Sequence, residues 1–175
     1  MIPNINYGLI QKAVDHYVWK GYKYLEVPWI IPKSTIEITK PTECRHFDTF
    51  LGGLVGSGEQ SFLEIRDELC PGRSYQCVTP CFRDDDLDQH HFNWFMKNEL
   101  IIPLWKTDNA KDYLNRMISD VFSFLRSYSP SAITIKETEE GTDLLLCDVE
   151  IGSYGIRQNR GFRWVYGTGL AEPRF

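Results

Sequence analysis

Residues 81–100 read CFRDDDLDQHHFNWFMKNEL. An arginine is followed by acidic residues and a histidine pair, and the stretch then passes into an apolar run. One interpretation is a charged hairpin that is exposed to solvent. The other is a binding loop in which an arginine, a carboxylate, a histidine and an aromatic ring hold one small, highly charged molecule, because arginine binds phosphate in bidentate geometry.

The segments around this loop predict strands. YQCVTPCFR and HFNWFMKNELIIPL flank the loop, AITIKE and DLLLCDVEIG form a second hairpin around TEEGT, and FRWVYGTG begins a last strand. YKYLEVPWIIP also favours a strand, but Pro28 and Pro32 cannot donate ladder hydrogen bonds, so we expect it at an edge or an interface. GGLVGSGEQ is interpreted as a glycine-rich loop.

Two segments have the apolar spacing of helices. The first runs through residues 5–18 and ends at Gly21, and the second is capped by Asp108 or Asn109 and runs through residues 113–125. Strands joined by hairpins, with helices placed apart from them, predict an α+β fold in which an antiparallel sheet is flanked by helices.

Composition sets limits on the class of protein. With 175 residues, of which 42% are hydrophobic, we expect residues 1–175 to form a single domain around one core. A net charge of -5 argues against a protein that coats nucleic acid by bulk charge. No window approaches the roughly 18 apolar residues that span a bilayer, so we expect a cytoplasmic protein with no membrane partner.

The cysteine pattern favours reduced thiols. The chain has five cysteines at uneven spacing, which does not suit a disulfide framework. Cys77 and Cys81 are four apart in a predicted strand and would lie on one face. We favour packed thiols there over a metal site, because no further cysteine or histidine completes a tetrahedral set.

FRDDDL, followed after three residues by HxxxF and then Glu99, resembles motif 2 of the class II aminoacyl-tRNA synthetases. The resemblance looks closest to the aspartyl, asparaginyl and lysyl subgroup. It implies that Arg83 binds the α-phosphate of ATP, Asp85 reads the adenine amino group, His91 reaches the γ-phosphate and Phe95 stacks on adenine. Asp85 is one methylene shorter than the usual Glu. Packing of Phe95 in the core is the alternative.

The other two class II motifs have counterparts in the expected order. GYKYLEVPWIIPKS resembles motif 1, which ends in a proline, here Pro28, and implies a homodimer through this segment. VYGTGLAEPRF resembles motif 3. It implies that Arg174 holds the γ-phosphate and that the backbone at Gly167 and Gly169 passes close to the nucleotide.

The resemblance also implies an amino-acid site. LVGSGEQSFLE matches the loop in which a Ser or Thr and a Glu grip the ammonium group, here Ser57 and Glu59. Gln76 and Glu99, on the strands of motif 2, are further candidates for contact with the amino acid.

EIGSYGIR resembles a strand shared by the aspartyl enzymes and the ammonia-dependent asparagine synthetases. Glu150 corresponds to a ligand of Mg²⁺ and phosphates, and Ser153 lies on the same strand. Arg157 corresponds to the arginine that pairs with an acidic substrate, which implies aspartate or a close analogue. The alternative is a surface pair of Arg157 with Asp148 or Glu150.

Taken together, the resemblance implies an enzyme that activates an amino acid with ATP and Mg²⁺ and forms an aminoacyl adenylate, with Arg83, Glu150 and Arg174 as catalytic residues. The acceptor could be tRNA, ammonia or a carrier protein. The chain has no counterpart of an anticodon-binding domain, so we expect a minimal or truncated paralogue. The alternative function is a non-catalytic, synthetase-like dimeric binding or regulatory module.

Overall fold

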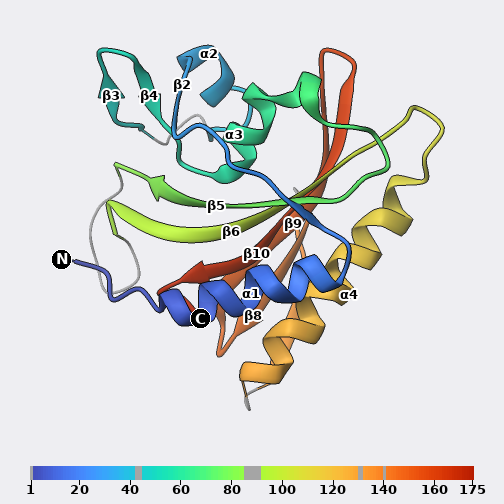
Figure 1. The fold of residues 1–175 in the computed structure, drawn as a ribbon. Helices are drawn as coiled ribbons and strands as arrows, with labels where there is room; N and C mark the ends of the chain where they lie inside the picture. The colour runs from blue at the N-terminus through green and yellow to red at the C-terminus, as the bar shows by residue number, and fades with distance from the viewer. Residues whose placement is uncertain (1, 42–44, 85–91, 130–131, 140) are drawn as a thin grey trace.

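A long sheet forms the centre of the computed structural model, which describes residues 2–41, 45–84, 92–129, 132–139 and 141–175 (Figure 1). The sheet has seven strands in the order β1-β5-β6-β10-β9-β8-β7. Its strands are β1 (Lys23–Tyr24), β5 (Tyr75–Phe82), β6 (Trp94–Pro103), β7 (Ile133–Glu137), β8 (Thr142–Leu146), β9 (Val149–Asn159) and β10 (Phe162–Glu172).

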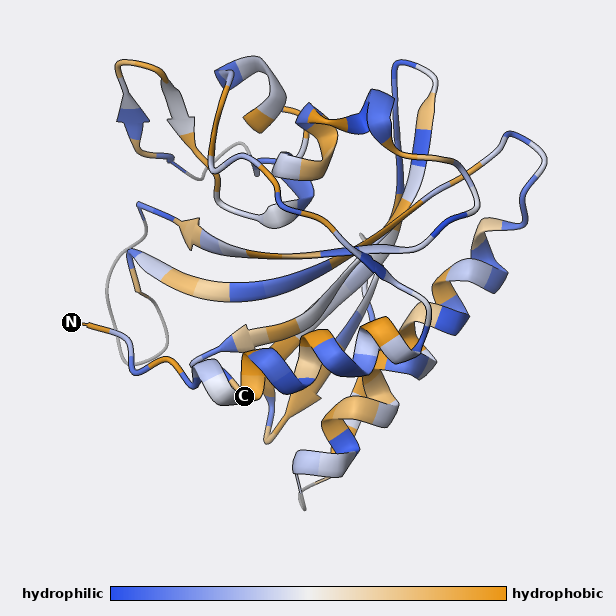
Figure 2. Ribbon diagram, in the orientation of Figure 1, coloured by the Kyte–Doolittle hydropathy of each residue, from blue (hydrophilic) through white to orange (hydrophobic). Residues whose placement is uncertain are grey.

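The two long helices cover one face of this sheet (Figure 1). They are α1 (Tyr7–Trp19) and α4 (Ala110–Tyr128), each begun by an asparagine side chain that caps the first turn: Asn6 accepts from the Leu9 amide, and Asn109 from the Lys111 amide. Apolar residues on both helices pack with residues of β6, β9 and β10, and Figure 2 shows the mixed hydrophobic and hydrophilic surfaces of the helices.

A second, smaller layer lies against the other face. It contains a three-stranded sheet in the order β2-β4-β3 and short helices. Its elements are β2 (Ile30–Ile31), α2 (Lys33–Ile36), β3 (Asp48–Thr49), β4 (Gly52–Leu54), α3 (Gly58–Glu64) and the 3-10 helix η1 (Arg66–Glu68). Phe62 and Leu63 of α3 pack on Ile101 of β6 and Trp164 of β10.

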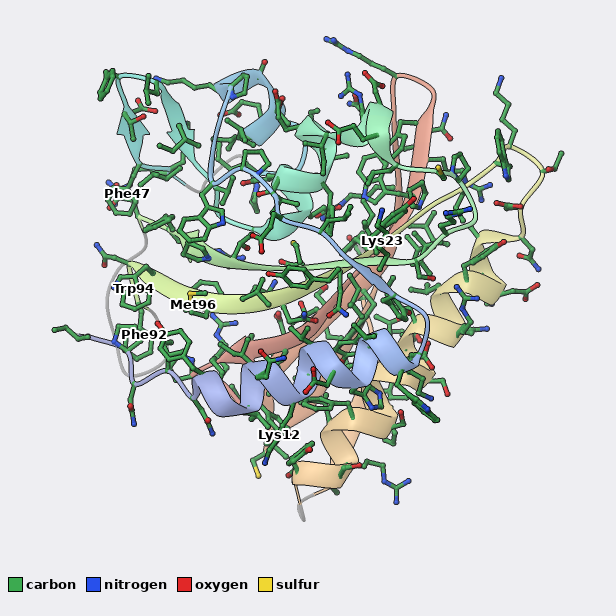
Figure 3. The ribbon with its side chains drawn as sticks, viewed as in Figure 1. Lys12, Lys23, Phe47, Phe92, Trp94 and Met96 are labelled. Carbon is green, nitrogen blue, oxygen red and sulfur yellow. The ribbon has the colours of Figure 1, made fainter. Side chains whose placement is uncertain are left out.

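Alternation along β6 decides which side chains face this second layer. Met96 and Leu100 pack with the α1 and α4 core, and in Figure 3 Trp94 and Met96 lie on the α1 side of the strand. Phe95, Lys97 and Glu99 therefore point to the opposite face, because successive side chains of a strand alternate.

The α+β prediction is confirmed, with local differences. β1 pairs with β5 in parallel, so the sheet is not wholly antiparallel. The predicted strand DLLLCDVEIG is divided between β8 and β9, since Cys147 and Asp148 turn the chain with φ values of 50° and 66°. The predicted glycine-rich loop contains β4 and the start of α3. In YKYLEVPWIIP, only two short strands form, and β1 is at the sheet edge, as expected.

The cysteine prediction is supported for the thiols that the structure describes. Cys77 and Cys81 are buried on one face of β5, and burial raises the pKa of both thiols, that of Cys81 to about 11. Cys70 and Cys147 are exposed and free, and Cys44 lies outside the described residues. In the part of the chain that is described, no helix is long and apolar enough to cross a membrane.

Candidate active site

A cavity of about 170 Å³ lies between the sheet and the second layer. Its floor is formed by side chains of β6, β9 and β10, and its walls by the start of α3 and by the segment that follows α2. The residues that line it are Ile36, Thr39, Lys40, Pro41, Arg45, His46, Gly56, Ser57, Glu59, Gln60, Phe82, Arg83, Lys97, Glu99, Glu150, Ser153, Arg157, Tyr166 and Thr168.

Two arginines and the Phe95 ring lie together at one end of the cavity, and Arg83 is the one of them that lines it. The Arg83 guanidinium lies over the Phe95 ring, 5.2 Å from its centroid, and its Nε donates to the Gly56 carbonyl at 3.3 Å. The guanidinium of Arg174 lies 5.8 Å from the centroid of the same ring. Phe95 is only 6% exposed and does not line the cavity, so its ring is not open here for the stacking on adenine that the resemblance implies.

The middle of the cavity holds a carboxylate with two donors. Oε1 of Glu99 accepts from Ser57 Oγ at 2.7 Å and from Lys97 Nζ at 2.8 Å. The Ser57 hydroxyl also accepts from the Glu59 amide and thereby caps α3. Glu99 is 3% exposed, and a carboxylate this deeply buried needs such partners.

The other end is closed by a second carboxylate. Glu59 accepts from Trp164 Nε1 at 2.7 Å through Oε1 and pairs with Arg157 through Oε2. The Arg157 guanidinium also stacks on the Tyr166 ring, 4.1 Å from its centroid. Burial raises the pKa of Glu59, although the charge of Arg157 and the Trp164 hydrogen bond act in the opposite direction.

Strand register gives the order in which the site residues follow one another along the cavity. Phe95 and Glu99 are four residues apart on β6, which is about 13 Å of strand, and Glu99 pairs with Thr168 of β10. Four residues earlier on β10, Trp164 pairs with Arg157 of β9. The Arg83–Phe95 contact and the Glu59–Arg157 pair therefore lie at opposite ends, with Lys97 and Glu99 between them.

Glu150 is the residue predicted as a metal ligand. It lines the cavity, is exposed, and takes no part in the ion pairs formed among the described residues. In the described ranges there is no group of three or more His, Cys, Asp or Glu side chains that could hold a metal ion alone. A magnesium ion that arrives with a nucleotide requires fewer protein ligands, since it is commonly held by one or two carboxylates together with phosphates.

Three predicted site residues lie elsewhere. Gln76 is fully buried on the helix side of the sheet, where its amide donates to the Val14 carbonyl and accepts from Asn98, so it does not line the cavity. Added Cβ atoms at Gly167 and Gly169 would meet side chains of the helix-side core, Tyr154 and Asn98 respectively. Tight packing against that core explains both glycines without a nucleotide.

The remaining predicted residues divide into three groups. Phe95 and Arg174 contact each other but do not line the cavity. Ser57, Glu59, Arg83, Glu99, Glu150, Ser153 and Arg157 are brought together around one cavity. Asp85 and His91 lie outside the described residues. Arg157 pairs with Glu59, not with Asp148 or Glu150 as the alternative interpretation held.

Sequence reasoning missed several residues that line the cavity. Lys97 could have been found from its alternation with Phe95 and Glu99 along one predicted strand. Lys40, Arg45 and His46 carry no such signal, because they come from an irregular segment. Arg45 also pairs with Asp84, at 3.1 Å, and so links that segment to the residues that follow β5.

The chain was compared with known proteins by sequence and by structure. By sequence, no family model and no curated protein matches it. By structure, it is similar to two structures of a pyrrolysyl tRNA synthetase from Desulfitobacterium hafniense. Their TM-scores are 0.70 and 0.68 at 15% and 16% identity, over 94% and 92% of this chain and 65% of each of theirs.

It is also similar to the cytoplasmic Serine-tRNA ligase of Naegleria fowleri in complex with AMP. The TM-score is 0.74 at 16% identity, over 95% of this chain and 46% of the ligase. The chain therefore spans less than two thirds of the length of each of these enzymes. None of them belongs to the aspartyl, asparaginyl and lysyl subgroup, which stays a prediction. At these identities the similarity concerns the fold, and the chain has the fold of a class II aminoacyl-tRNA synthetase catalytic domain.

Proposed function

We propose that this protein activates an amino acid with ATP, forming an enzyme-bound aminoacyl adenylate and releasing pyrophosphate. The observation that carries the proposal is the order of groups along one cavity: Arg83, which contacts Phe95, lines one end, and the Ser57–Glu99–Lys97 cluster lies next to it. A nucleotide needs a cation for its phosphates, and an amino acid needs acceptors for its ammonium group. The two groups must lie next to each other for the substrates to react.

The nucleotide is assigned to the Arg83 end. A purine ring would replace one guanidinium group on the Phe95 ring, since a flat base and a flat cation stack on an aromatic face in similar ways. The displaced guanidinium of Arg83 or Arg174 would then be available to phosphate oxygens. The AMP complex of the structurally similar serine ligase is in keeping with this assignment.

The amino acid is assigned to the middle of the cavity. Glu99 and Ser57 would bind the ammonium group, since a carboxylate and a hydroxyl accept its N–H bonds. Lys97 already donates to Glu99 at 2.8 Å and lies between Glu99 and Phe95 on the strand. Its ammonium would therefore meet the substrate carboxylate close to the α-phosphate.

The reaction needs no side-chain base, because the amino acid carboxylate is already ionised. One of its oxygens forms a bond to the α-phosphorus of ATP while the bond from that phosphorus to the bridging oxygen of pyrophosphate breaks. Arg83 and Lys97 would stabilise the charge that gathers on the phosphate oxygens. Magnesium bound with the nucleotide would neutralise phosphate charge, and Glu150 is the residue that would hold it.

Partners beyond ATP and the amino acid are part of the same proposal. Trp29 and Ile30 follow Pro28 and are 48% and 39% exposed, which supports a homodimer through this segment. The acceptor of the activated amino acid would be tRNA, ammonia or a carrier protein. Aspartate or a close analogue is the substrate that the resemblance of EIGSYGIR favours.

Amino-acid-dependent exchange of pyrophosphate into ATP tests the function. We expect exchange with at least one of the twenty amino acids, and its loss by about 100-fold in Arg83→Met. Arg126→Met, on the exposed side of α4, is the matched control and should exchange like the parent protein. Tight binding of ATP without exchange for any amino acid would refute catalysis and leave a non-catalytic binding module.

A further inference from the structure

The Glu59–Arg157 pair at the end of the cavity bears on which amino acid fits. Arg157 alone would make that end positive and would attract an acidic side chain. In the structure its guanidinium is paired with Glu59, and Glu59 is held in place by the Trp164 indole at 2.7 Å. The positive charge is therefore already matched by a carboxylate of the protein.

Burial and neighbouring side chains hold both members of the Glu59–Arg157 pair in position. Glu59 is 5% exposed and Trp164 is fully buried. Arg157 stacks on Tyr166, and an added Cβ at residue 155 would lie 2.6 Å from the Tyr166 hydroxyl oxygen, so Gly155 makes room for that ring. These contacts limit the freedom of both charged side chains to separate.

A substrate side chain at this end meets one acceptor group and one donor group. A carboxylate there would be repelled by Glu59, and an ammonium by Arg157. An apolar side chain would exclude water from both charged groups and would form no hydrogen bonds in place of those that the water made. This loss is unfavourable. A neutral group that both donates and accepts hydrogen bonds meets neither penalty.

We infer that the Glu59–Arg157 pair selects an amino acid with a short, neutral, hydrogen-bonding side chain, a carboxamide or a hydroxyl, and rejects its carboxylate counterpart. This inference rests on the proposed function. Arg157 by itself suggests that the site prefers aspartate to asparagine, and the inference predicts the opposite preference. Glu59 acts here as a residue of side-chain recognition, and Glu99 with Ser57 takes the ammonium role.

Pairs of amino acids that differ only in one polar group of the side chain give the sharpest test. Pyrophosphate exchange is measured with asparagine against aspartate and with serine against alanine. We expect at least one neutral polar amino acid to be activated about tenfold or more faster than its partner, since like charges about 4 Å apart repel by at least this factor at a protein surface. Faster activation of aspartate than of asparagine and serine would overturn the inference and leave the proposed function intact.

The charge of the pair is then changed without changing its size. Glu59→Gln keeps an oxygen for the Trp164 indole and removes the negative charge that faces Arg157, so the preference should move toward aspartate by about tenfold or more. Glu68→Gln on the exposed 3-10 helix is the matched control and should keep the parental preference. An unchanged asparagine-to-aspartate ratio in folded Glu59→Gln contradicts the role assigned to Glu59.

Direct binding separates this inference from the proposed function. Binding of asparagine, serine and aspartate without ATP is followed by NMR chemical shifts of the indole N–H protons, which include Trp164 Nε1–H. If exchange is absent but asparagine or serine binds more tightly than aspartate, the inference stands and the adenylation proposal fails. If neither neutral amino acid binds more tightly than aspartate, the inference fails whatever the exchange assay shows.

Discussion

At the scale of single residues, Lys97 is the side chain whose position was least expected. It is 14% exposed and bonded to Glu99, on the strand face that also carries Phe95. We expect Lys97→Met to lower pyrophosphate exchange by about 100-fold, because a positioned cation that meets developing charge contributes this much. Lys136→Met, at an exposed position of β7, is the matched control. If Lys97→Met exchanges pyrophosphate at the rate of the parent protein, Lys97 has no role in catalysis.

Glu59 provides a prediction on pH. Burial raises its pKa above the ordinary value of 4.5, so the folded state binds a proton more readily than the unfolded state. Glu59 makes its full contribution to the free energy of unfolding below pH 4.5. This contribution is lost as the pH rises through the raised pKa. The free energy of unfolding of the parent protein should therefore fall relative to that of Glu59→Gln over this range.

Urea titrations at several pH values measure this difference. Because the charge of Arg157 lowers the pKa of Glu59, Arg157→Met should make the loss of stability with rising pH larger. A difference between the parent protein and Glu59→Gln that grows with pH in favour of the parent protein would show that the carboxylate is better stabilised in the fold than in water.

At the scale of elements, β10 depends on a close approach to α1. The register of β10 against β6 shifts between Thr168 and Leu170, and the Gly169 carbonyl accepts from the Tyr17 hydroxyl of α1 at 2.7 Å. An added Cβ at Gly169 would lie 2.1 Å from Asn98 Oδ1 and 2.8 Å from the Tyr17 ring. The irregular segment of β10 is therefore packed against both the neighbouring strand β6 and helix α1.

We expect Gly169→Ala to lower the free energy of unfolding by about 1–3 kcal/mol, as overpacking of a core does. Gly8→Ala, in the first turn of α1, meets only Asn6 Oδ1 at 3.4 Å and should be neutral or stabilising by about 0.5–1 kcal/mol. Chemical denaturation measures both variants. Equal effects at the two glycines would contradict the packing described here.

At the scale of the whole molecule, a bound nucleotide should stabilise the fold. Phe95 comes from the sheet, Arg83 directly follows β5, and Ser57 comes from the second layer, so a ligand between them links the sheet and the second layer. At about 100 times its Kd, ATP with Mg²⁺ should stabilise the folded state by about 2.7 kcal/mol. Thermal unfolding should show the shift in the parent protein and in Arg126→Met but not in Arg83→Met, and an equal shift in all three would place the nucleotide elsewhere.

The sequence by itself determined the class of fold and named several residues that line the cavity. Hairpin order, helix spacing and the asparagine cap of α4 depend on neighbours along the chain, so they could be predicted from local patterns. The motif-like segments also placed Ser57, Arg83 and Glu99 in one cavity correctly. The split between β8 and β9 was missed, because positive φ at Cys147 and Asp148 is not a strong preference of those residues.

Only the tertiary structure decided how the charged groups pair. Glu59 and Arg157 are 98 residues apart in the chain, so their ion pair has no local signal, and it changes what each side chain offers to a substrate. The same holds for Gln76, whose strand position suited the site but whose face of the sheet was set by packing against α1. Charge pairing depends on long-range packing, which local sequence does not carry. Alternation along a strand assigns side chains to two faces, but packing decides which face meets the cavity.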